Sequence, residues 1–296
     1  MKTKILYLQL LLLSFGISYS FSQSVSINTT VYYSAIDSAL REKVQQYGAD
    51  QVLVVFDIDN TILTSDTDLG SDIWYNWQKG AEGPKLKEGQ KIEDDCFKNE
   101  AIGLLYELGT MSPTDTLLPG YIKSWQELGI TIFALTSRSP DYRAATEREL
   151  NRNDIHLDRT QLRTSEGKKL ILSDTIFGRK MSYINGIMMT TGMNKGLMLD
   201  YLLDTTGMSF RSVIFVDDTE RHINAVSEKA SEYHTTDLVL FNYTKILTER
   251  KKNNHDEVLT QEQADKMASD WEELIRMLNT LFPERMEKSP CKTDVK

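Results

Sequence analysis

Short apolar runs alternate with longer amphipathic stretches over most of the chain. The runs are rich in β-branched and aromatic residues, which is typical of strands that are buried on both faces of a sheet. They occupy residues 52–56, 130–135, 213–216 and 238–243. Between them apolar residues recur at helical spacing, as in residues 32–47, where Ile36, Leu40 and Val44 share one face. This alternation predicts an α/β fold with a central parallel sheet flanked by helices.

The pattern loosens between residues 64 and 118, after the first apolar run. Glycines interrupt this segment, Trp74, Tyr75 and Trp77 cluster near its start, and residues 100–108 have helical spacing. We therefore expect an insertion with a small structure of its own. Its aromatic side chains would either stack on a ligand or form the core of the insertion, and the core is favoured because aromatic residues dominate buried area.

A second departure from the pattern covers residues 170–191, where strand-like stretches surround Asn185 and Gly186. This dipeptide is a strong signal for a two-residue β-hairpin. A predicted helix follows from Gly192 to about Gly207, with Lys195 in its first turn. The sequence leaves open whether the hairpin covers a site or extends the edge of the sheet.

The C-terminal region is predicted to contain one long helix. Residues 249–256 are polar and are expected to form a linker. Residues 259–282 place Met267, Trp271 and Leu274 on one stripe, which should pack on the domain. Residues 289–296 are expected to be disordered. The chain from residue 23 to residue 296 is thus interpreted as a single domain with insertions.

The first 22 residues are typical of a secretory signal peptide. Lys2 and Lys4 precede an apolar stretch at residues 5–17, and small residues follow at 18–22. The apolar stretch is shorter than the roughly 20 residues of a membrane-spanning helix. We expect the mature protein to begin near residue 23, to be secreted or periplasmic, and to have no membrane contact after the signal is removed.

The net charge limits the kinds of molecule that the protein is expected to bind. The formal net charge is -9 and no run of basic residues occurs, which argues against nucleic acid because phosphate backbones bind clustered Lys and Arg. A small phosphorylated substrate is compatible with this composition.

Export allows Cys96 and Cys291 to pair, but one lies in the insertion and the other in the polar tail. Free thiols are the default expectation, and a disulfide is left open.

Polar side chains suited to chemistry follow three of the predicted strands at their carboxyl ends. They are Asp57 and Asp59 after the first run, Thr136, Ser137 and Arg138 after the second, and Asp217 and Asp218 after the third. Open α/β folds bind their ligands at this edge of the sheet. A lone Asp-x-Asp is more often a solvated turn, and a lone Thr more often caps a turn, so the combination is what indicates a site.

These residues resemble the four motifs of the haloacid dehalogenase-like phosphatase superfamily, in the same order. The motifs are F-D-I-D-N-T at residues 56–61, T-S-R at 136–138, Lys195, and D-D at 217–218. The amino-acid sequences of these motifs are most similar to those of bacterial exported acid phosphatases and of a related branch known only as a domain of unknown function. The resemblance covers about residues 50–245. It implies a Rossmann-like core and a cap formed by the insertion.

The resemblance also implies a nucleophile, an acid and a metal. Asp57 is the implied nucleophile, which forms an aspartyl-phosphate, and Asp59 is the implied general acid and base. A Mg²⁺ ion is implied, because several converging carboxylates would otherwise repel. Its implied ligands are the Asp57 carboxylate, the Asp59 backbone carbonyl and one of Asp217 and Asp218, and the choice between these two stays open.

The phosphoryl group is implied to contact Thr136 and Lys195, which supply a hydroxyl donor and a positive charge. Ser137 and Arg138 are expected to belong to the same binding loop. Dehalogenases and ion pumps lack the second Asp of the first motif, so Asp59 disfavours both, and export disfavours a phosphomutase. The sequence thus favours an exported Mg-dependent phosphomonoester hydrolase. The alternative is a catalytically silent module that binds a ligand or a protein at the cell surface, and the physiological substrate and the oligomeric state stay open.

Overall fold

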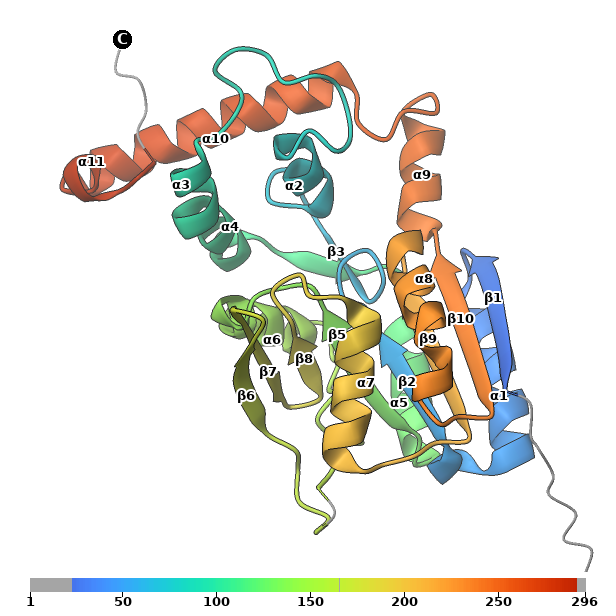
Figure 1. Cartoon of the computed structure of the whole chain (residues 1–296). Coiled ribbons are helices and arrows are strands. Elements are labelled where there is room, and N and C mark those ends of the chain that lie inside the picture. Colours follow the sequence, from blue (N-terminus) through green and yellow to red (C-terminus); the bar gives the residue numbers. More distant parts are fainter. Residues whose placement is uncertain (1–22, 165, 292–296) are drawn as a thin grey trace, which may run out of the picture.

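The structure, a computed structural model, describes residues 23–164 and 166–291, so the predicted signal peptide at 1–22 lies outside the described residues. Its centre is an eight-stranded sheet with the order β1-β10-β9-β2-β5-β8-β7-β6 (Figure 1). The strands are β1 (Ser24–Thr30), β2 (Val52–Phe56), β5 (Thr131–Thr136), β6 (Leu172–Ile176), β7 (Arg179–Ile184), β8 (Ile187–Met189), β9 (Ser212–Asp217) and β10 (Asp237–Tyr243). From β1 to β8 in this order, neighbouring strands pair in parallel. The predicted α/β fold with a largely parallel sheet is confirmed.

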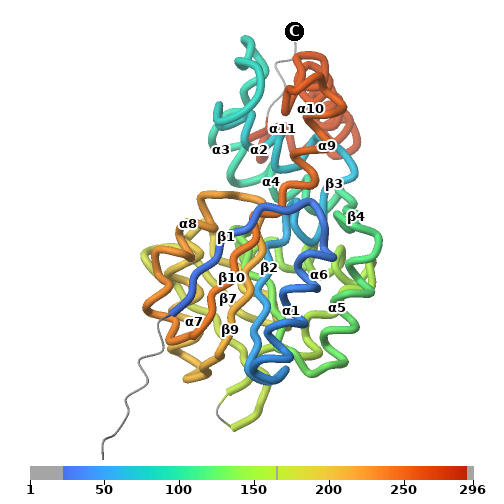
Figure 2. The backbone as a smooth tube through the Cα atoms, turned by 90° about the vertical axis from the view of Figure 1, so that its right-hand side faces the viewer, coloured from blue at the N-terminus to red at the C-terminus, as the bar shows by residue number. Residues whose placement is uncertain are grey.

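Helices cover both faces of this sheet. One face carries α1 (Tyr33–Tyr47), α5 (Leu118–Glu127) and α6 (Arg143–Arg152), and the other carries α7 (Lys195–Thr206) and α8 (Glu220–Glu228) (Figure 2). Along β2, Val52, Val54 and Phe56 pack into the core of the first face, whereas Leu53 and Val55 pack into the core of the second. A strand that is buried on both faces needs apolar residues at every position, which explains the continuous run in the sequence.

The segment that contains Asn185 and Gly186 extends the sheet. β6 pairs antiparallel with β7, β7 pairs antiparallel with β8, and β8 continues the parallel sheet beside β5. Asn185 and Gly186 join β7 to β8 with φ angles of 52° and 73°, as a two-residue turn with left-handed positions requires. Gly186 is also required by space, because a Cβ atom there would lie 2.3 Å from the carbonyl oxygen of Leu157. Of the two alternatives, the structure therefore shows the edge of the sheet.

The insertion lies beyond the carboxyl edge of the parallel strands, at the top of Figure 1. β3 (Leu63–Ser65) leads into it and β4 (Met111–Pro113) leads out, and the two pair as a separate antiparallel sheet. Between them are α2 (Asp72–Gln78), α3 (Asp94–Cys96), a π-helical turn η2 (Phe97–Ala101) and α4 (Ile102–Leu108). Trp74 and Trp77 are buried, as expected for a core, whereas Tyr75 is 41% exposed.

The C-terminal region packs on this insertion. It consists of α9 (Lys245–Asn253), α10 (Gln261–Leu281) and α11 (Arg285–Lys288), and α10 is the long helix that the sequence predicts. Met267 and Trp271 of α10 share a hydrophobic cluster with Trp74, Trp77 and Phe97. The insertion and α10 therefore have a common core, which is distinct from the two clusters on the faces of the sheet.

The expectations for the linker and for residues 289–291 of the tail are wrong, and the cysteines form the disulfide that the sequence leaves open. Most of the expected linker at 249–256 is α9, because its Glu, Arg and Lys residues favour a helix and Arg250 pairs with Asp68 of the insertion. Cys96 and Cys291 form a disulfide, with their Cα atoms 4.7 Å apart. α10 runs along the insertion and returns the tail to it, so residues 289–291 are placed against the insertion instead of being disordered. Residues 292–296 lie outside the described residues.

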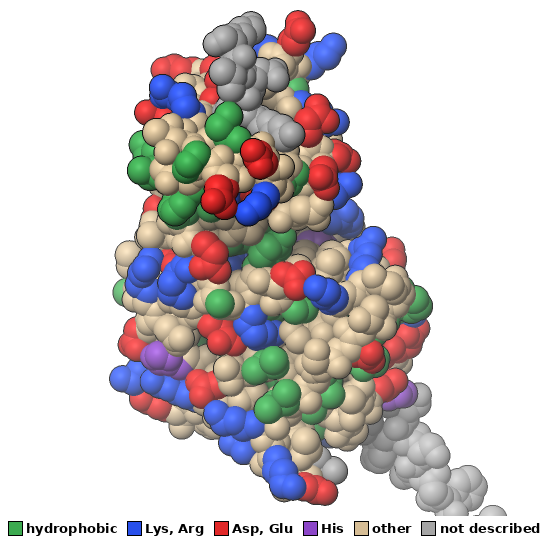
Figure 3. Space-filling view, turned by 90° about the vertical axis from the view of Figure 1, so that its left-hand side faces the viewer, with side chains coloured by type: hydrophobic (Ala, Val, Ile, Leu, Met, Phe, Trp, Pro, Cys, Tyr) green, Lys and Arg blue, Asp and Glu red, His purple; other side chains and the backbone are tan. Residues whose placement is uncertain are grey.

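Three short 3₁₀ helices complete the described elements, namely η1 (Ala49–Gln51), η3 (Pro140–Tyr142) and η4 (Ala230–Glu232). Within residues 23–164 and 166–291, no helix has both the length and the apolar character needed to cross a membrane. On the face that Figure 3 shows, acidic and basic side chains are intermixed.

Candidate functional site

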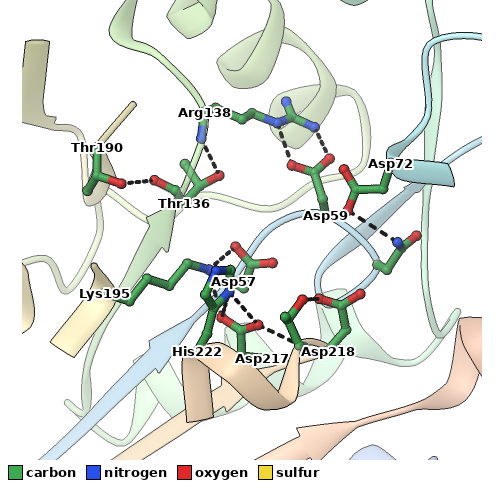
Figure 4. A network of polar contacts seen from close by, with 12 residues as sticks. Asp57, Asp59, Asp72, Thr136, Arg138, Thr190, Lys195, Asp217, Asp218 and His222 are labelled. Carbon is green, nitrogen blue, oxygen red and sulfur yellow. Dashed lines mark hydrogen bonds and ion pairs between the residues drawn. The ribbon is translucent and has the colours of Figure 1, made fainter. Parts of the chain in front are cut away.

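The residues that the sequence places at strand ends meet at one point of the carboxyl edge (Figure 4). Asp57 follows β2, Thr136 ends β5 and Asp217 ends β9, and β2 lies between the other two strands in the sheet. Lys195 is the first residue of α7 and reaches the same point. The convergence follows from the parallel pairing, because parallel strands end at a common edge.

Lys195 is fully buried, and its ammonium group lies between two carboxylates. Nζ donates to Oδ1 of Asp57 at 2.5 Å and to Oδ2 of Asp217 at 2.7 Å. Burial alone would lower the pKa of Lys195, but the charges of Asp217 and Asp57 raise it above its ordinary value, so the side chain is a cation. Gly196 allows α7 to approach α8 closely, because a Cβ atom there would lie 2.1 Å from the carbonyl oxygen of Ala225.

Asp217 is buried among hydrogen-bond donors. Its Oδ1 accepts from the backbone N–H of Thr219 at 2.9 Å and lies 3.0 Å from Nδ1 of His222, while Oδ2 accepts from Lys195. Burial alone would raise the pKa of Asp217, but the charge of Lys195 and the hydrogen bond with His222 lower it. Asp217 is therefore an ionised group whose two oxygens already have protein partners.

Asp218 adds a further carboxylate to the site. Asp57, Asp217 and Asp218 each offer an oxygen that lies within 4.8 Å of those of the other two, a spacing that one ion can bridge. Burial raises the pKa of Asp57 to about 7. Burial, and then the charges of Asp217 and Asp57, raise the pKa of Asp218 well above its ordinary value. A divalent cation would offset this excess negative charge, and a set of oxygen ligands suits Mg²⁺, so the residues fit the implied metal.

Asp59 points toward Arg138 (Figure 4). The guanidinium donates to both carboxylate oxygens, with Nε 2.8 Å from Oδ2 and Nη2 2.6 Å from Oδ1. This bidentate pair is a strong and directional contact. The Asp59 carboxylate thus belongs to an ion pair beside the cluster of Asp57, Asp217 and Asp218, whose oxygens form the candidate metal site.

Thr136 and Ser137 begin the loop after β5. The Thr136 hydroxyl accepts from the backbone N–H of Arg138 at 3.2 Å. The hydroxyl of Thr190 donates to the carbonyl oxygen of Thr136 at 2.8 Å, and the N–H of Gly192 donates to that of Ser137 at 2.9 Å. The segment after β8 therefore fixes this loop from one side, and the Thr136 hydroxyl caps its turn.

Two side chains at the site are absent from the sequence prediction. His222 lies in the first turn of α8, five residues after Asp217. Its short distance in the sequence from the acidic pair could have identified it as a residue of the site. Asp72 is the first residue of α2, and Asn60 donates to it at 3.4 Å. Burial, and then the charges of Asp59 and Asp57, raise the pKa of Asp72 well above its ordinary value. No local pattern marks Asp72, because its place depends on how the insertion folds back over the sheet.

Fold and site together define an α/β protein with a Rossmann-like central sheet and a buried cluster of aspartates at its carboxyl edge. The chain belongs to the family described as "Protein of unknown function (DUF2608)", whose model matches residues 33–284. It is also similar to a protein of Chlamydia pneumoniae named "Putative outer membrane protein", at 23% identity over 193 residues, which are 63% of this chain and 67% of that protein. Neither name states an activity.

Proposed function

We propose that this chain is a Mg²⁺-dependent phosphomonoester hydrolase of the haloacid dehalogenase-like superfamily, which acts through an aspartyl-phosphate at Asp57. The observation that carries the proposal is the buried ammonium of Lys195, which joins Asp57 to Asp217 beside the carboxylate of Asp218. Phosphoryl transfer depends on positioning and on electrostatic stabilisation of the equatorial oxygens. A nucleophile, a fixed cation and a metal-compatible cluster at one sheet edge supply both.

The first step joins Asp57 to phosphorus. An oxygen of its carboxylate attacks phosphorus as the bond from phosphorus to the leaving oxygen breaks. Lys195 offsets the charge of Asp57 and of the phosphoryl oxygens. The Thr136 hydroxyl accepts from Arg138 and can donate its own proton to a phosphoryl oxygen.

Asp59 moves protons in both steps of this mechanism. In the first step the protonated carboxyl group of Asp59 gives its proton to the leaving oxygen, which departs as an alcohol. In the second it takes a proton from the water that attacks the aspartyl-phosphate, which releases phosphate and restores Asp57. The bidentate contact with Arg138 suits the carboxylate form, which is the form that takes the proton from water.

The metal would be held by Asp57 and Asp218, with the backbone carbonyl of Asp59. Asp217 is the less suitable ligand, because its oxygens already accept from Lys195 and Thr219 and contact His222. Asp218 accepts from the Thr219 hydroxyl at 3.1 Å, and a bound cation would oppose the burial and the negative charges of Asp217 and Asp57 that raise its pKa. When bound, the ion would neutralise charge on the transferred phosphoryl group.

The proposal includes export to the periplasm or the exterior. The disulfide supports it, because disulfides persist in oxidising compartments, and so does the reference to the outer membrane in the name of the Chlamydia relative. N-terminal sequencing of the native protein should find a start between residues 21 and 23. An intact Met1 in the cytoplasmic fraction would exclude export.

The second candidate is a catalytically silent module that binds a ligand or a protein through the same site. The purified mature protein should release nitrophenol from p-nitrophenyl phosphate, lose this activity in EDTA and regain it with Mg²⁺. Asp57→Asn is the matched control, because it keeps the shape of the side chain and removes the nucleophile. If metal-dependent release is absent, or if Asp57→Asn retains it in full, the binding module becomes the better interpretation.

A further inference from the structure

Arg138 is a buried cation whose guanidinium contacts side chains on its edge and on its face. Nε and Nη2 donate to Asp59, and Nη1 donates to Oγ1 of Thr146 at 2.9 Å. Nη2 also lies 3.2 Å from Sδ of Met111. The ring of Tyr106 covers the face, with Cζ of Arg138 4.5 Å from the ring centroid. The guanidinium is therefore fixed in position and in orientation.

Two of these contacts come from the insertion. Tyr106 lies on α4 and Met111 begins β4, whereas Arg138 belongs to the loop after β5. Tyr106 also packs against the ring of Tyr142 next to that loop, with 5.0 Å between centroids. Asp59 lies in the loop after β2. The guanidinium of Arg138 thus contacts both the insertion and Asp59, the candidate general acid.

The plane of the guanidinium determines the direction of the Asp59 carboxylate. A bidentate pair consists of two parallel hydrogen bonds in one plane, so a rotation of the guanidinium turns the carboxylate or breaks a bond. An aromatic ring over a guanidinium attracts it and limits this rotation. A change in the position of Tyr106 would therefore change the orientation of the Asp59 carboxylate.

We propose that Tyr106 is a positioning residue for proton transfer. Its ring holds the plane of Arg138, and Arg138 holds the Asp59 carboxyl group in the orientation from which it gives its proton to the leaving oxygen. The inference rests on the proposed function, because that function gives Asp59 its proton-transfer role. It assigns a purpose in the reaction to the insertion, which carries Tyr106.

The readout that separates positioning from folding is the dependence on the leaving group. An alkoxide leaves poorly without a proton from Asp59, whereas nitrophenolate leaves readily without one. The ratio kcat/KM reports the steps up to departure of the leaving group. It therefore excludes the hydrolysis of the aspartyl-phosphate, which all substrates share.

The experiment compares Tyr106→Leu with Tyr106→Phe on ethyl phosphate and on p-nitrophenyl phosphate. Tyr106→Leu should lower kcat/KM for ethyl phosphate by about 10-fold to 100-fold, as expected for a misplaced catalytic group. It should change kcat/KM for p-nitrophenyl phosphate by no more than about twofold, because that substrate needs little protonation. Tyr106→Phe keeps the ring and should restore the wild-type value on both substrates.

Tyr75→Leu is the matched control within the insertion. Tyr75 is an aromatic residue that packs on Phe97, 5.5 Å between centroids, and it is 41% exposed. It should leave the ratio between the two substrates unchanged. Equal losses on both substrates in Tyr106→Leu, or an unchanged rate on ethyl phosphate, would overturn the inference.

A measurement without turnover separates this inference from the proposed function. The Nε–H of Arg138 donates to Asp59 at 2.8 Å, and its NMR signal should be protected from solvent exchange in the wild type. The protection should be lost in Tyr106→Leu and kept in Tyr106→Phe. Protection that persists in Tyr106→Leu overturns the positioning role even in an active enzyme, whereas loss of protection in a protein without phosphatase activity would reject the proposed function alone.

Discussion

Asp57 and Asp59 are two positions apart, yet their surroundings differ in kind. Asp57 faces the buried ammonium of Lys195 and the carboxylates of the metal-compatible cluster. Asp59 faces the guanidinium of Arg138. The first environment suits a group that bonds to phosphorus, and the second suits a group that only moves protons. Substitutions of the two residues should therefore fail in different ways.

Asp57→Asn should eliminate turnover and covalent labelling, because no other carboxylate takes its in-line position. Asp59→Asn should slow each step by about 10²-fold to 10⁴-fold, the usual contribution of a general acid or base. An aryl phosphate should still phosphorylate Asp59→Asn, and acid quench followed by mass spectrometry should find about 80 Da on the peptide with Asp57, as for an aspartyl-phosphate. A phosphoryl group on another residue would contradict these roles.

Substitutions of Asp217 and of Asp218 should also have different effects. Asp218→Asn should weaken Mg²⁺ binding by at least about 10-fold, since it removes a proposed ligand, and should change stability little. Asp217→Asn should instead cost about 3–5 kcal/mol of unfolding free energy, because it breaks the buried pair with Lys195. Calorimetric titration with Mg²⁺ and urea denaturation measure the two effects. The reverse pattern would make Asp217 the metal ligand.

The affinity for Mg²⁺ should depend on pH because the pKa of Asp57 is raised to about 7. Among the charged groups around Asp57, Lys195 lowers its pKa, whereas the negative charges of Asp217 and Asp59 raise it. Below pH 7 the ion must displace a proton from Asp57, so affinity should fall by up to about tenfold per pH unit. Asp218, the other proposed ligand, also has a raised pKa and would add a second proton to this dependence. Titration calorimetry between about pH 5.5 and 8 tests this, and a constant affinity would be inconsistent with the raised pKa.

The strands that form the site could be predicted because each is buried on both faces. Every residue of β2 is apolar, and the polar residues at the carboxyl ends of β2, β5 and β9 meet because the strands are parallel. β1 could not be predicted in this way. It is an edge strand whose Val25 and Ile27 are 42% and 53% exposed, so no apolar run marks it. The pattern along the chain reports burial, and it is silent where burial is partial.

The contact between α7 and α8 positions Lys195 and depends on a glycine. Gly196→Ala should destabilise the fold by about 1–3 kcal/mol and lower activity, because the new Cβ would collide with the backbone of Ala225. Gly120→Ala in α5 is the matched control, since nothing lies within 4 Å of the position of its Cβ. It should be neutral or stabilising by up to about 1 kcal/mol. Thermal denaturation of both variants measures the difference, and similar stabilities would contradict the close approach.

Across the whole molecule, the insertion and the C-terminal helix share one core, although most of the central sheet and its helices lie between them in the sequence. Trp271 of α10 and Trp74 of α2 belong to one hydrophobic cluster, and Cys291 is bonded to Cys96. These contacts could not be predicted, because each helix shows only that it has an apolar face and not which face it meets. The same limitation hid Asp72, which the insertion brings to the site.

Removal of the disulfide should lower the stability of the oxidised protein. The bond joins residues 195 positions apart, and closing a loop of that length in the unfolded chain is worth up to about 5 kcal/mol. Cys96→Ser with Cys291→Ser should therefore unfold at lower urea concentration than the wild type. Reductant should shift the wild type and not the double variant. Equal midpoints for the oxidised wild type and the double variant would show that the bond adds no stability.

The bond between Cys96 and Cys291 also sets an order in time. A chain is synthesised from its N-terminus, and Cys291 follows β10, the last described strand in the sequence. Every described strand of the sheet is therefore synthesised before the two thiols can meet. The insertion acquires its covalent link last, after the strands that hold Asp57, Thr136 and Asp217.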